Sequence, residues 1–522
     1  MFIKNIYKDI TQKREYKRYS EKEDRGRRLK AQIFAIFAIV LGAVYLVVLP
    51  GLINAEAHAM GKLFYVAEFL CYALLVFFIV SVWYPRYQRE EGLTAEKDHS
   101  VDVFITCCGE PIEIIAKTVG AAAAIDYSNY VIYILDDGKS EDVADLASQY
   151  GARYLSRPER TDAKAGNLNF GLSHASGDLV LVLDADQVPQ PEIIKKMVGY
   201  FNLEKIGYVQ SRQTYFLPED DPFFNQDEVF YGMIQMGRDN NNTVISCGSG
   251  IIYRRKALDD IGGFSTWNLV EDLHTSFQLN AKGWRSLYYS YPLSRGLAPD
   301  HVWAVFKQRR QWCTDTLRMF FWDNPLFKKG LNLRQRMDYF FICLNYIVMG
   351  WAVPFFFVVP VWSNFSMTPV LNTPVLHYLA FRSLYLVSSL VAFKFLSYQQ
   401  PNARQFQAQT GYFPVYIYGT VQALFSRTKK PQYKPNTPKD IKRNFPEILA
   451  VFPHMLLIVL NIVSPFYAMY FFVPAHFVLV NCFFSAFAIW TLSSVVFATF
   501  VKKTWSKENN IREFYGQNTK TV

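Results

Sequence analysis

Apolar residues are gathered into long runs toward both ends of the chain, whereas the middle is mostly polar. A run of about 20 apolar residues is long enough to cross a bilayer as an α-helix. Six runs reach this length, two at 31–84 and four within 323–501, on either side of a polar region at 85–322. The predicted spans are Ala31–Ile53, Leu63–Tyr84, Tyr339–Val361, Leu376–Leu396, Ile448–Phe471 and His476–Val501.

The polar region has the pattern of an α/β domain. Val101–Ile105, Tyr130–Leu135 and Leu179–Leu183 are short apolar runs of the kind that form buried strands, and the stretches Ile112–Ala124 and Glu141–Tyr150 between them are helix-like. Strands that alternate with helices form βαβ units around a parallel sheet. We therefore predict a Rossmann-like α/β domain with a mixed sheet, inserted between transmembrane α-helices.

The distribution of charge predicts how the spans are oriented. Basic residues flank them on one side, whereas the loops 54–61, 363–375 and 472–475 contain neither Lys nor Arg. The positive-inside rule then places both termini and the polar region in the cytoplasm. We expect a multi-pass protein of the plasma membrane with a basic N-terminal segment at 1–30 and a cytosolic tail at 502–522.

Composition supports a lipid bilayer as partner and argues against nucleic acid. Hydrophobic residues make up 51% and charged residues 19% of the chain, and the net charge of +10 is concentrated at the membrane flanks. No basic stripe with interleaved aromatic residues occurs elsewhere, as a nucleic-acid surface would require. The seven cysteines show no CxxC spacing, so we expect neither a disulfide framework nor a zinc site. Arg382 lies within the fourth predicted span, where a charge indicates either a functional site or a side chain that reaches the interface.

Two acidic pairs directly follow predicted strands, Asp136 with Asp137 and Asp184 with Asp186. Either pair alone is also explained by turn chemistry. In sheets of this type, however, ligands bind at the carboxyl ends of the strands. Two carboxylates one residue apart can share a hard divalent cation that also bridges a diphosphate. Because the sequence has neither a Walker A motif nor a dinucleotide fingerprint, the pairs favour a nucleotide that is bound through metal and scattered cations.

Seven short motifs follow one another between Val101 and Asn324. They are Asp136–Gly138, Ala163–Asn169, Asp184–Pro189, Val209–Gln213, Cys247–Gly250, Val270–Asp272 and Gln308–Trp312. In order and spacing they resemble the processive family-2 inverting glycosyltransferases, in particular bacterial cellulose synthase catalytic subunits and β-glucan (capsular polysaccharide) synthases. The resemblance implies a GT-A-like fold for the α/β domain and a UDP-sugar donor.

The same resemblance assigns donor and metal sites. Asp136 or Asp137 is expected to contact the uracil and ribose side of the donor, and Lys164 to lie near its diphosphate. Asp184 and Asp186 are expected to hold Mg²⁺ or Mn²⁺ on that diphosphate, where the metal offsets the charge of the departing UDP.

Catalysis is assigned to Val270–Asp272 in the same way. Asp272 is expected to act as the general base that deprotonates the acceptor hydroxyl, and the neighbouring Glu271 to position rather than to act as a second base. A single base and direct displacement at the anomeric carbon imply inversion, so that an α-linked donor gives a β-linked product.

The acceptor site is also taken from the resemblance. Gln308 and Trp312 match the QxxRW element, in which the Trp stacks on the terminal sugar of the polymer. A Trp at this position is alternatively explained as a membrane-interface aromatic. Gln213, Cys247 and Gly248 belong to motifs expected near the acceptor.

One position departs from the family pattern. Where the QxxRW element has an arginine, this chain has Gln311. Arg309 or Arg310 is left to make the phosphate contact that this arginine makes in the family, and Gln308 is also expected on the donor side.

The region after the α/β domain contains three further features. Asn324–Met337 and Phe406–Phe425 have the composition of amphipathic helices at the cytoplasmic face. The segment 429–443 resembles the gating loop of cellulose synthases, with Thr437 and Lys439 as its matching residues, and a proline-rich connector is the alternative.

These features together predict a processive enzyme that polymerises sugar from a UDP-sugar, most simply UDP-glucose, onto a growing polysaccharide and exports the product through its own spans. A hyaluronan- or chitin-type synthase that uses UDP-GlcNAc shares this architecture. A non-processive enzyme acting on a polyprenyl phosphate shares the acidic pairs but does not need Gln308 and Trp312. A transporter or scaffold would be expected to have lost one of the acidic residues, and all are present.

Overall fold

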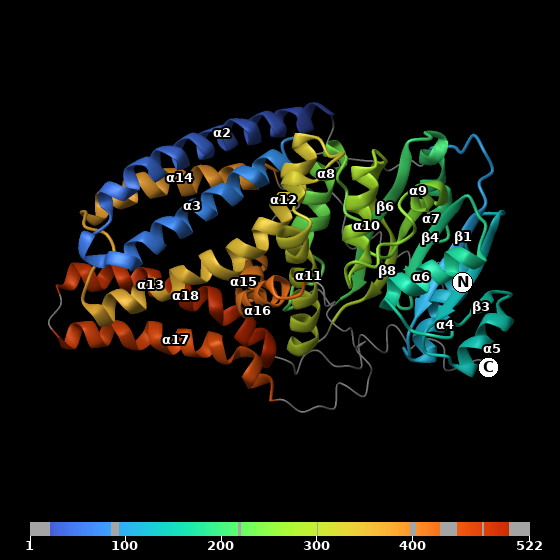
Figure 1. The fold of residues 1–522 in the computed structure, drawn as a ribbon. Helices are drawn as coiled ribbons and strands as arrows, with labels where there is room; N and C mark the ends of the chain where they lie inside the picture. Colours follow the sequence, from blue (N-terminus) through green and yellow to red (C-terminus); the bar gives the residue numbers. More distant parts are fainter. Residues whose placement is uncertain are drawn as a thin grey trace.

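The computed structural model describes residues 21–84, 93–217, 221–299, 301–396, 403–427, 446–471 and 474–500. Its long helices lie together at one end of the molecule, and a twisted sheet with its covering helices lies at the other (Figure 1). Thr437 and Lys439, the two matching residues of the expected gating loop, lie outside the described residues.

Six helices of the described chain are long and apolar enough to cross a membrane, which confirms the six predicted spans. The first helix begins at Glu21 rather than at the predicted Ala31, because the charged stretch before the apolar run is also helical. In chain order the elements of this part are α2 (Glu21–Leu52), η1 (Ala55–Ala57), α3 (His58–Ser81), α12 (Leu333–Ile347) continued through η5 (Val348–Ala352) into α13 (Val353–Ser366), α14 (Val375–Leu396), α17 (Glu447–Tyr470) and α18 (Ala475–Phe500).

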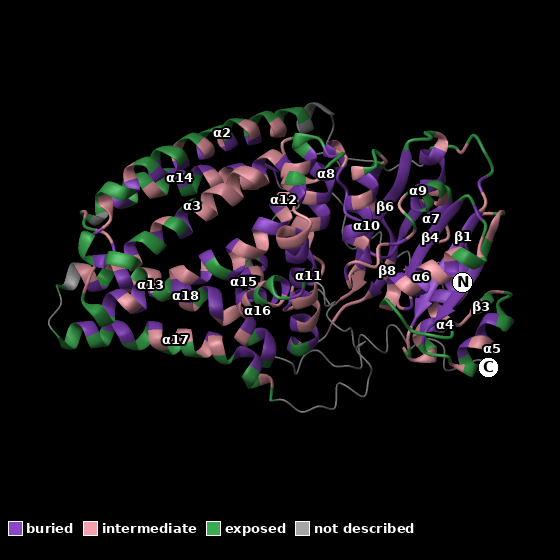
Figure 2. Cartoon of the chain, viewed as in Figure 1, coloured by how far each residue is buried: buried purple, intermediate pink, exposed green. Residues whose placement is uncertain are grey.

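The long helices form two groups. Helix α14 packs along α2 and, like α3, belongs to the first group, whereas α13, α17 and α18 pack on one another. Residues Ala31, Ala35 and Ala38 of α2 are buried at helical spacing, and such small residues allow close helix packing in membranes. Large apolar side chains such as Val47 of α2 and Phe466 of α17 are exposed. Figure 2 shows exposed residues in green along both helices.

A buried ion pair joins the first group internally. Arg382 of α14 contacts the Glu68 carboxylate of α3, and its Nη1 also donates to the Tyr45 hydroxyl of α2 at 2.9 Å. The guanidinium lies 5.8 Å from the Tyr378 ring and 5.7 Å from the Phe356 ring. The charge that the sequence placed in the fourth span is therefore paired within the helix group rather than directed to the membrane surface.

The expectation of a separate amphipathic helix over Asn324–Met337 is wrong. A short 3₁₀ turn, η4 (Pro325–Phe327), is followed by Gly330 with φ of 88°, and α12 begins at Leu333. Asn332 and Gln335 form a capping box that fixes this start, so the basic stretch becomes the first turns of the third span. The second aromatic stretch forms two helices, α15 (Ala403–Gly411) and α16 (Phe413–Leu424).

The α/β domain contains an eight-stranded mixed sheet in the order β3-β2-β1-β4-β7-β6-β8-β5. Strands β1 to β4 run parallel, and β7 is antiparallel to both β4 and β6. The expected mixed α/β sheet is thus confirmed. The strands are β1 (Val101–Cys107), β2 (Tyr130–Asp136), β3 (Arg153–Leu155), β4 (Leu179–Asp184), β5 (Val188–Pro189), β6 (Ile206–Phe216), β7 (Ile251–Arg254) and β8 (Arg285–Leu297).

Helices cover both faces of the sheet, because alternate strand residues point to opposite sides. Val103 and Ile105 of β1 pack in a core with helices of one face, whereas Phe104 packs with Leu168 of the other face. The helices of this domain are α4 (Ile112–Ala123), α5 (Glu141–Gln149), α6 (Ala163–His174), α7 (Ile193–Met197), η2 (Val198–Asn202), η3 (Phe230–Ile234), α8 (Gln235–Asn241), α9 (Arg255–Asp260), α10 (Glu271–Ala281) and α11 (Val302–Trp322).

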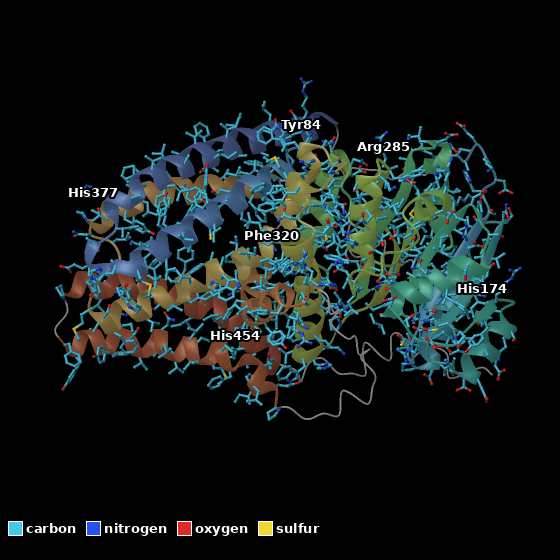
Figure 3. The ribbon with its side chains drawn as sticks, viewed as in Figure 1. Tyr84, His174, Arg285, Phe320, His377 and His454 are labelled. Carbon is cyan, nitrogen blue, oxygen red and sulfur yellow. The ribbon has the colours of Figure 1, made fainter. Side chains whose placement is uncertain are left out.

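Two helices connect the sheet to the long helices. From α8, Asn241 Nδ2 donates to Asp338 Oδ2 of α12 at 2.9 Å and to the Ser81 carbonyl of α3 at 3.1 Å. Helix α11 packs along α16 and also on α12, where the ring centroid of Phe320, labelled in Figure 3, lies 5.6 Å from that of Phe340. The sheet is therefore held against the long helices by buried contacts.

Candidate active site

Asp136 and Asp137, at the end of β2, use their carboxylates for contacts within the protein. Asp136 accepts hydrogen bonds from the backbone N–H of Gly138 at 2.6 Å and of Ser140 at 2.8 Å, and from the Tyr154 hydroxyl at 3.0 Å. These bonds hold the turn that follows the strand. Contact of either carboxylate with a donor stays a prediction.

Asp137 forms a buried two-point ion pair with Arg157. Arg157 Nε donates to one carboxylate oxygen at 2.7 Å and Nη2 to the other at 2.8 Å. The same guanidinium donates to the carbonyls of Thr161, in the loop before α6, and of Ala163, the first residue of α6. Asp162 and Ala163 have φ of 58° and 46°, a region that non-glycine residues rarely adopt. Arg157 therefore holds a strained loop directly before Lys164.

Lys164 is the point at which three motifs meet. Its Nζ lies 2.5 Å from Asp184 Oδ1, 2.7 Å from the Gly248 carbonyl and 3.5 Å from Glu271 Oε1. Burial by itself lowers the pKa of Lys164, but the charges of Asp184 and Glu271 outweigh it, so that the pKa is raised. The Asp184 backbone N–H donates to Ser249 Oγ at 2.9 Å, which fixes the two loops against each other. The cation is thus retained among carboxylates that come from distant parts of the chain.

Glu271 and Asp272 begin α10 beside this cation. Asp272 Oδ1 accepts the Leu273 backbone N–H at 2.5 Å. A Cβ at Gly248 would lie 3.1 Å from Asp272 Oδ2, and Gly248 has φ of 74°, so a glycine suits this close approach. Burial, followed by the Glu271 charge, raises the pKa of Asp272 well above the ordinary aspartate range. Burial also raises the pKa of Glu271.

Asp186 lies beyond Asp184 on the same loop. Its Oδ2 accepts the Leu297 backbone N–H at 3.2 Å. Burial and the neighbouring Asp184 raise the pKa of Asp186 to about 7. The Asp184 side chain is 37% exposed and so is accessible to a ligand.

Glu110 is a further carboxylate at this edge that the sequence reasoning missed. Its Oε2 accepts the Cys108 backbone N–H at 2.5 Å, and burial raises its pKa, with further contributions from Asp184 and Asp136. A signal was present in the sequence, because Glu110 follows β1 as the acidic pairs follow β2 and β4. Within the described ranges, no group of three or more His, Cys, Asp or Glu side chains is placed to hold a metal.

Gln213 and Cys247 shape the loop that carries Gly248. Gln213 Nε2 donates to the carbonyls of Cys247 and Ser249, each at 2.9 Å, and its Oε1 accepts from the Tyr231 hydroxyl at 2.9 Å. The Cys247 backbone N–H donates to Gln210 Oε1 at 2.8 Å. Burial raises the pKa of the Cys247 thiol, which keeps it neutral.

Helix α11 carries Gln308 and Trp312, both half-buried. The Arg309 guanidinium lies 4.7 Å from the Trp312 ring, and its Nη1 lies 3.3 Å from Asp227 Oδ2. The Arg310 guanidinium lies 5.2 Å from the Tyr418 ring of α16. The partners of the two arginines are thus Trp312 on α11 itself, Asp227 in the loop before η3 and Tyr418 on α16. Neither Lys164 nor Asp184 is among them. A phosphate contact of either arginine therefore remains a prediction.

Comparisons with known proteins agree with this geometry. Residues 99–314 match the family model described as "Glycosyltransferase like family 2". The cellulose synthase 1 catalytic subunit (UDP-forming) of Komagataeibacter xylinus is 34% identical over 324 residues, which are 59% of this chain and 40% of the relative. The cellulose synthase catalytic subunit (UDP-forming) of Xanthomonas axonopodis pv. citri is 33% identical over 295 residues, which are 54% of this chain and 40% of the relative.

A solved structure supports the fold. The mannosyltransferase of Pyrobaculum calidifontis, solved in complex with GDP-Man and Mn²⁺, superimposes with a TM-score of 0.52 at 14% identity, over 69% of this chain and 99% of that structure. The chain spans about two fifths of the length of the curated relatives named above. The segment 99–314 is thus a glycosyltransferase domain of the family-2 type, and with its flanking apolar helices the chain resembles the catalytic subunits of cellulose synthases.

Proposed function

We propose that this chain is a membrane-integrated, processive glycosyltransferase. It transfers sugar from a UDP-sugar, with UDP-glucose as the expected donor, to a growing β-linked polysaccharide with inversion. The observation that carries the proposal is the convergence of Lys164, Asp184, Gly248 and Glu271 beside Asp272. The likeness to relatives named UDP-forming cellulose synthases supports the choice of donor.

In this proposal Lys164 binds the donor diphosphate. Its Nζ is already held within 2.7 Å of two oxygens and keeps its charge, so an anionic group that approaches the partly exposed Asp184 meets a fixed cation. Fixed charges placed where charge develops stabilise the transition state without reorganisation of the site. Lys164 would thus stabilise the negative charge that appears on the departing UDP.

Asp272 accepts the proton of the acceptor hydroxyl. Its raised pKa makes it a stronger base than an ordinary aspartate once it is ionised. Because the hydroxyl attacks the anomeric carbon directly, the single displacement inverts the configuration. Glu271 holds Lys164 at 3.5 Å and so acts on the orientation of the site.

Asp184 and Asp186 fit a divalent cation. The pKa of Asp186 is raised to about 7 by burial and by the neighbouring Asp184, so a bound cation would be stabilising here. Mg²⁺ is commonly held by one or two carboxylates together with substrate phosphates and water. Bound Mg²⁺ or Mn²⁺ would supply Lewis-acid help to the departing diphosphate.

The membrane part exports the product in this proposal. Trp312 binds the terminal sugar at the entrance, and the helices after it provide the path through the bilayer. The positive-inside pattern supports a cytoplasmic position for the glycosyltransferase domain and both termini. The growing polysaccharide, the UDP-sugar and the lipid bilayer are then the partners of the chain.

The test uses the full chain purified into lipid nanodiscs. UDP release is measured with UDP-Glc, UDP-GlcNAc, UDP-Gal and UDP-GlcA, each with and without EDTA. We expect the highest rate with UDP-Glc, loss of turnover in EDTA and loss of turnover in Asp186→Asn. Stimulation by UDP-GlcNAc alone contradicts the glucan product, and full activity in EDTA removes the metal from the mechanism.

A further inference from the structure

Helix α11 contacts the segment that leads into the proposed base. Asp315, on α11, accepts the Val270 backbone N–H at 2.8 Å and the Leu269 backbone N–H at 3.4 Å. Its own carbonyl accepts from Asn268 Nδ2 at 3.1 Å. Three consecutive residues before Glu271 are therefore attached to one side chain and one carbonyl of α11.

Arg318, one turn further along α11, holds the same segment from its other end. Its Nη1 donates to the Trp267 carbonyl at 2.8 Å and to Asn268 Oδ1 at 3.0 Å, and the guanidinium lies 4.6 Å from the Trp267 ring. Nε donates to the Ser426 carbonyl at 3.1 Å, beyond α16. Arg318 thus links the segment before α10 to α11 and to the chain that directly follows α16.

Asp315 and Arg318, whose side chains form these hydrogen bonds, are both buried. Asp315 is 2% exposed and Arg318 1% exposed, and their closest charged atoms are 3.9 Å apart. Burial raises the pKa of Asp315 to about 7 against the effect of its hydrogen bonds. A buried carboxylate is costly unless hydrogen bonds satisfy it. Here it accepts the amides of Val270, the N-cap of α10, and of Leu269 before it, and the N–H of an N-cap has no partner within its own helix.

The helix that holds this segment also carries the proposed sugar platform. Trp312, Asp315 and Arg318 recur at intervals of three residues, so that on α11 Asp315 lies next to both, about 60° around the helix from each. The base Asp272 follows two residues after Val270. One rigid helix therefore sets the separation between the residue that binds the acceptor sugar and the residue that accepts its proton.

We propose that Asp315 and Arg318 are positioning residues that hold Asp272 in register with Trp312. The proposal rests on the proposed function, because it assigns the acceptor to Trp312 and the base to Asp272. A misplacement of about 1 Å at a reacting group can cost about 10²-fold in rate. The proposed donor contacts Lys164 and Asp184 lie in other loops, and this segment is linked to them through Glu271, whose carboxylate lies 3.5 Å from Lys164 Nζ.

The first measurement separates kcat from KM in the full chain in nanodiscs. In Asp315→Ala, and in Arg318→Met, we expect kcat for UDP release to fall at least about tenfold, while the UDP-sugar KM stays within about twofold. Asp315→Asn keeps one acceptor oxygen and the side-chain volume, so it should recover part of the lost kcat. The double variant should lose less than the product of the two single losses, because both residues hold one segment.

Asp102→Asn is the matched control. Asp102 is also buried, accepts the Gly177 backbone N–H at 2.6 Å and pairs with Arg255 at 2.9 Å, but it lies at the opposite end of β1 from the site. Its kcat per folded molecule should match that of the wild type. An unchanged kcat in folded Asp315→Ala overturns the proposal, as does a KM that rises in proportion to the loss of kcat.

The second measurement does not depend on activity. Hydrogen exchange is followed by mass spectrometry in wild type and Asp315→Ala. We expect faster exchange in peptides that cover 265–274 and unchanged exchange in peptides that cover Lys164 and Asp184. If the wild type releases UDP from no UDP-sugar, the proposed function fails, and the exchange result still decides the positioning role. Unchanged exchange over 265–274 would refute it.

Discussion

Asp272 is a half-buried carboxyl group with a buried second carboxyl, Glu271, directly beside it, and this placement determines how it works as a base. Burial and the Glu271 charge raise its pKa well above the ordinary range. A base acts only when it is deprotonated, so turnover should rise with pH as Asp272 loses its proton through that raised pKa. Lys164, at 3.5 Å from Glu271, limits the shift by favouring the charged forms.

Asp272→Asn removes the proton acceptor and preserves the side-chain shape. We expect turnover to fall by about 10²–10⁴, while UDP affinity, measured by calorimetry, stays within a few-fold of wild type. Glu271→Gln is the companion variant, and we expect it to weaken UDP binding because Lys164 loses a partner at 3.5 Å. A collapse of UDP affinity in Asp272→Asn would make Asp272 a binding residue and place the base elsewhere.

At the scale of single residues, the sequence located the acidic groups but not their partners. Asp184 and Asp186 were predicted from their position after an apolar strand, and the structure places them at the end of β4. The pairing of Asp137 with Arg157 was not predicted, because it joins residues 20 positions apart through a bend that only the folded loop provides. Glu110 was missed because it is a single acidic residue, although it follows β1 as the two acidic pairs follow β2 and β4.

The loop between β3 and α6 is the element that presents Lys164. Arg157 binds the Asp137 carboxylate at two points and also the loop carbonyls of Thr161 and Ala163. An added Cβ at Gly166 would meet the Thr161 carbonyl and the Arg157 guanidinium, so the loop closes tightly against the first turn of α6. The place of the lysine therefore depends on a buried guanidinium.

Arg157→Lys keeps the charge but cannot bind the carboxylate at two points. We expect the UDP-sugar KM to rise about tenfold, equivalent to roughly 1.4 kcal/mol, with a smaller change in kcat, in steady-state assays of UDP release. Arg153→Met is the control, because Arg153 is an exposed residue whose guanidinium stacks on Tyr133 at 5.4 Å. The double variant Asp137→Asn with Arg157→Met removes both charges and should fold. A wild-type KM in Arg157→Lys would contradict the role of this loop.

At the scale of elements, periodicity predicted what is local. The strands β1, β2 and β4 and the helices α4 and α5 match the expected ranges within two residues. Strands β6 and β8 were not predicted, because their long pairing joins segments that are distant in sequence and contains register shifts. The start of α12 was misassigned, because the capping box of Asn332 and Gln335 outweighs the amphipathic pattern of the stretch before it.

At the scale of the whole molecule, the glycosyltransferase domain and the long helices share buried contacts through α8, α11 and α12. Trp312 lies on α11, the helix that connects the sheet to α16. This arrangement supports coupling of elongation to export in one chain. The helix count and the position of two spans before and four after the glycosyltransferase domain were predictable from hydropathy, whereas the packing of α14 on α2 was not, since it depends on contacts across the whole chain.

Sealed inside-out vesicles that contain the chain test this coupling. With UDP-sugar supplied outside, we expect new polymer in the lumen, where it resists added glycan hydrolase until detergent is present. Trp312→Ala should lose polymer and retain slow UDP release, because the donor site is intact and the sugar platform is not. Polymer that is fully digested without detergent would assign export to another protein.

The ion pair between Arg382 and Glu68 also bears on the order in which the protein is assembled. The two residues are 314 positions apart, so α3 is synthesised long before α14 supplies the guanidinium. A lone charged residue at the centre of a membrane helix costs roughly 2.5–3.5 kcal/mol during insertion. The first two helices therefore enter the bilayer with an unmatched acidic group, and the glycosyltransferase domain is made on the ribosome before its counter-charge exists. The ion pair of the membrane part can form only after α14, the fourth span, has been made, because its Arg382 supplies the positive charge that pairs with Glu68 of α3.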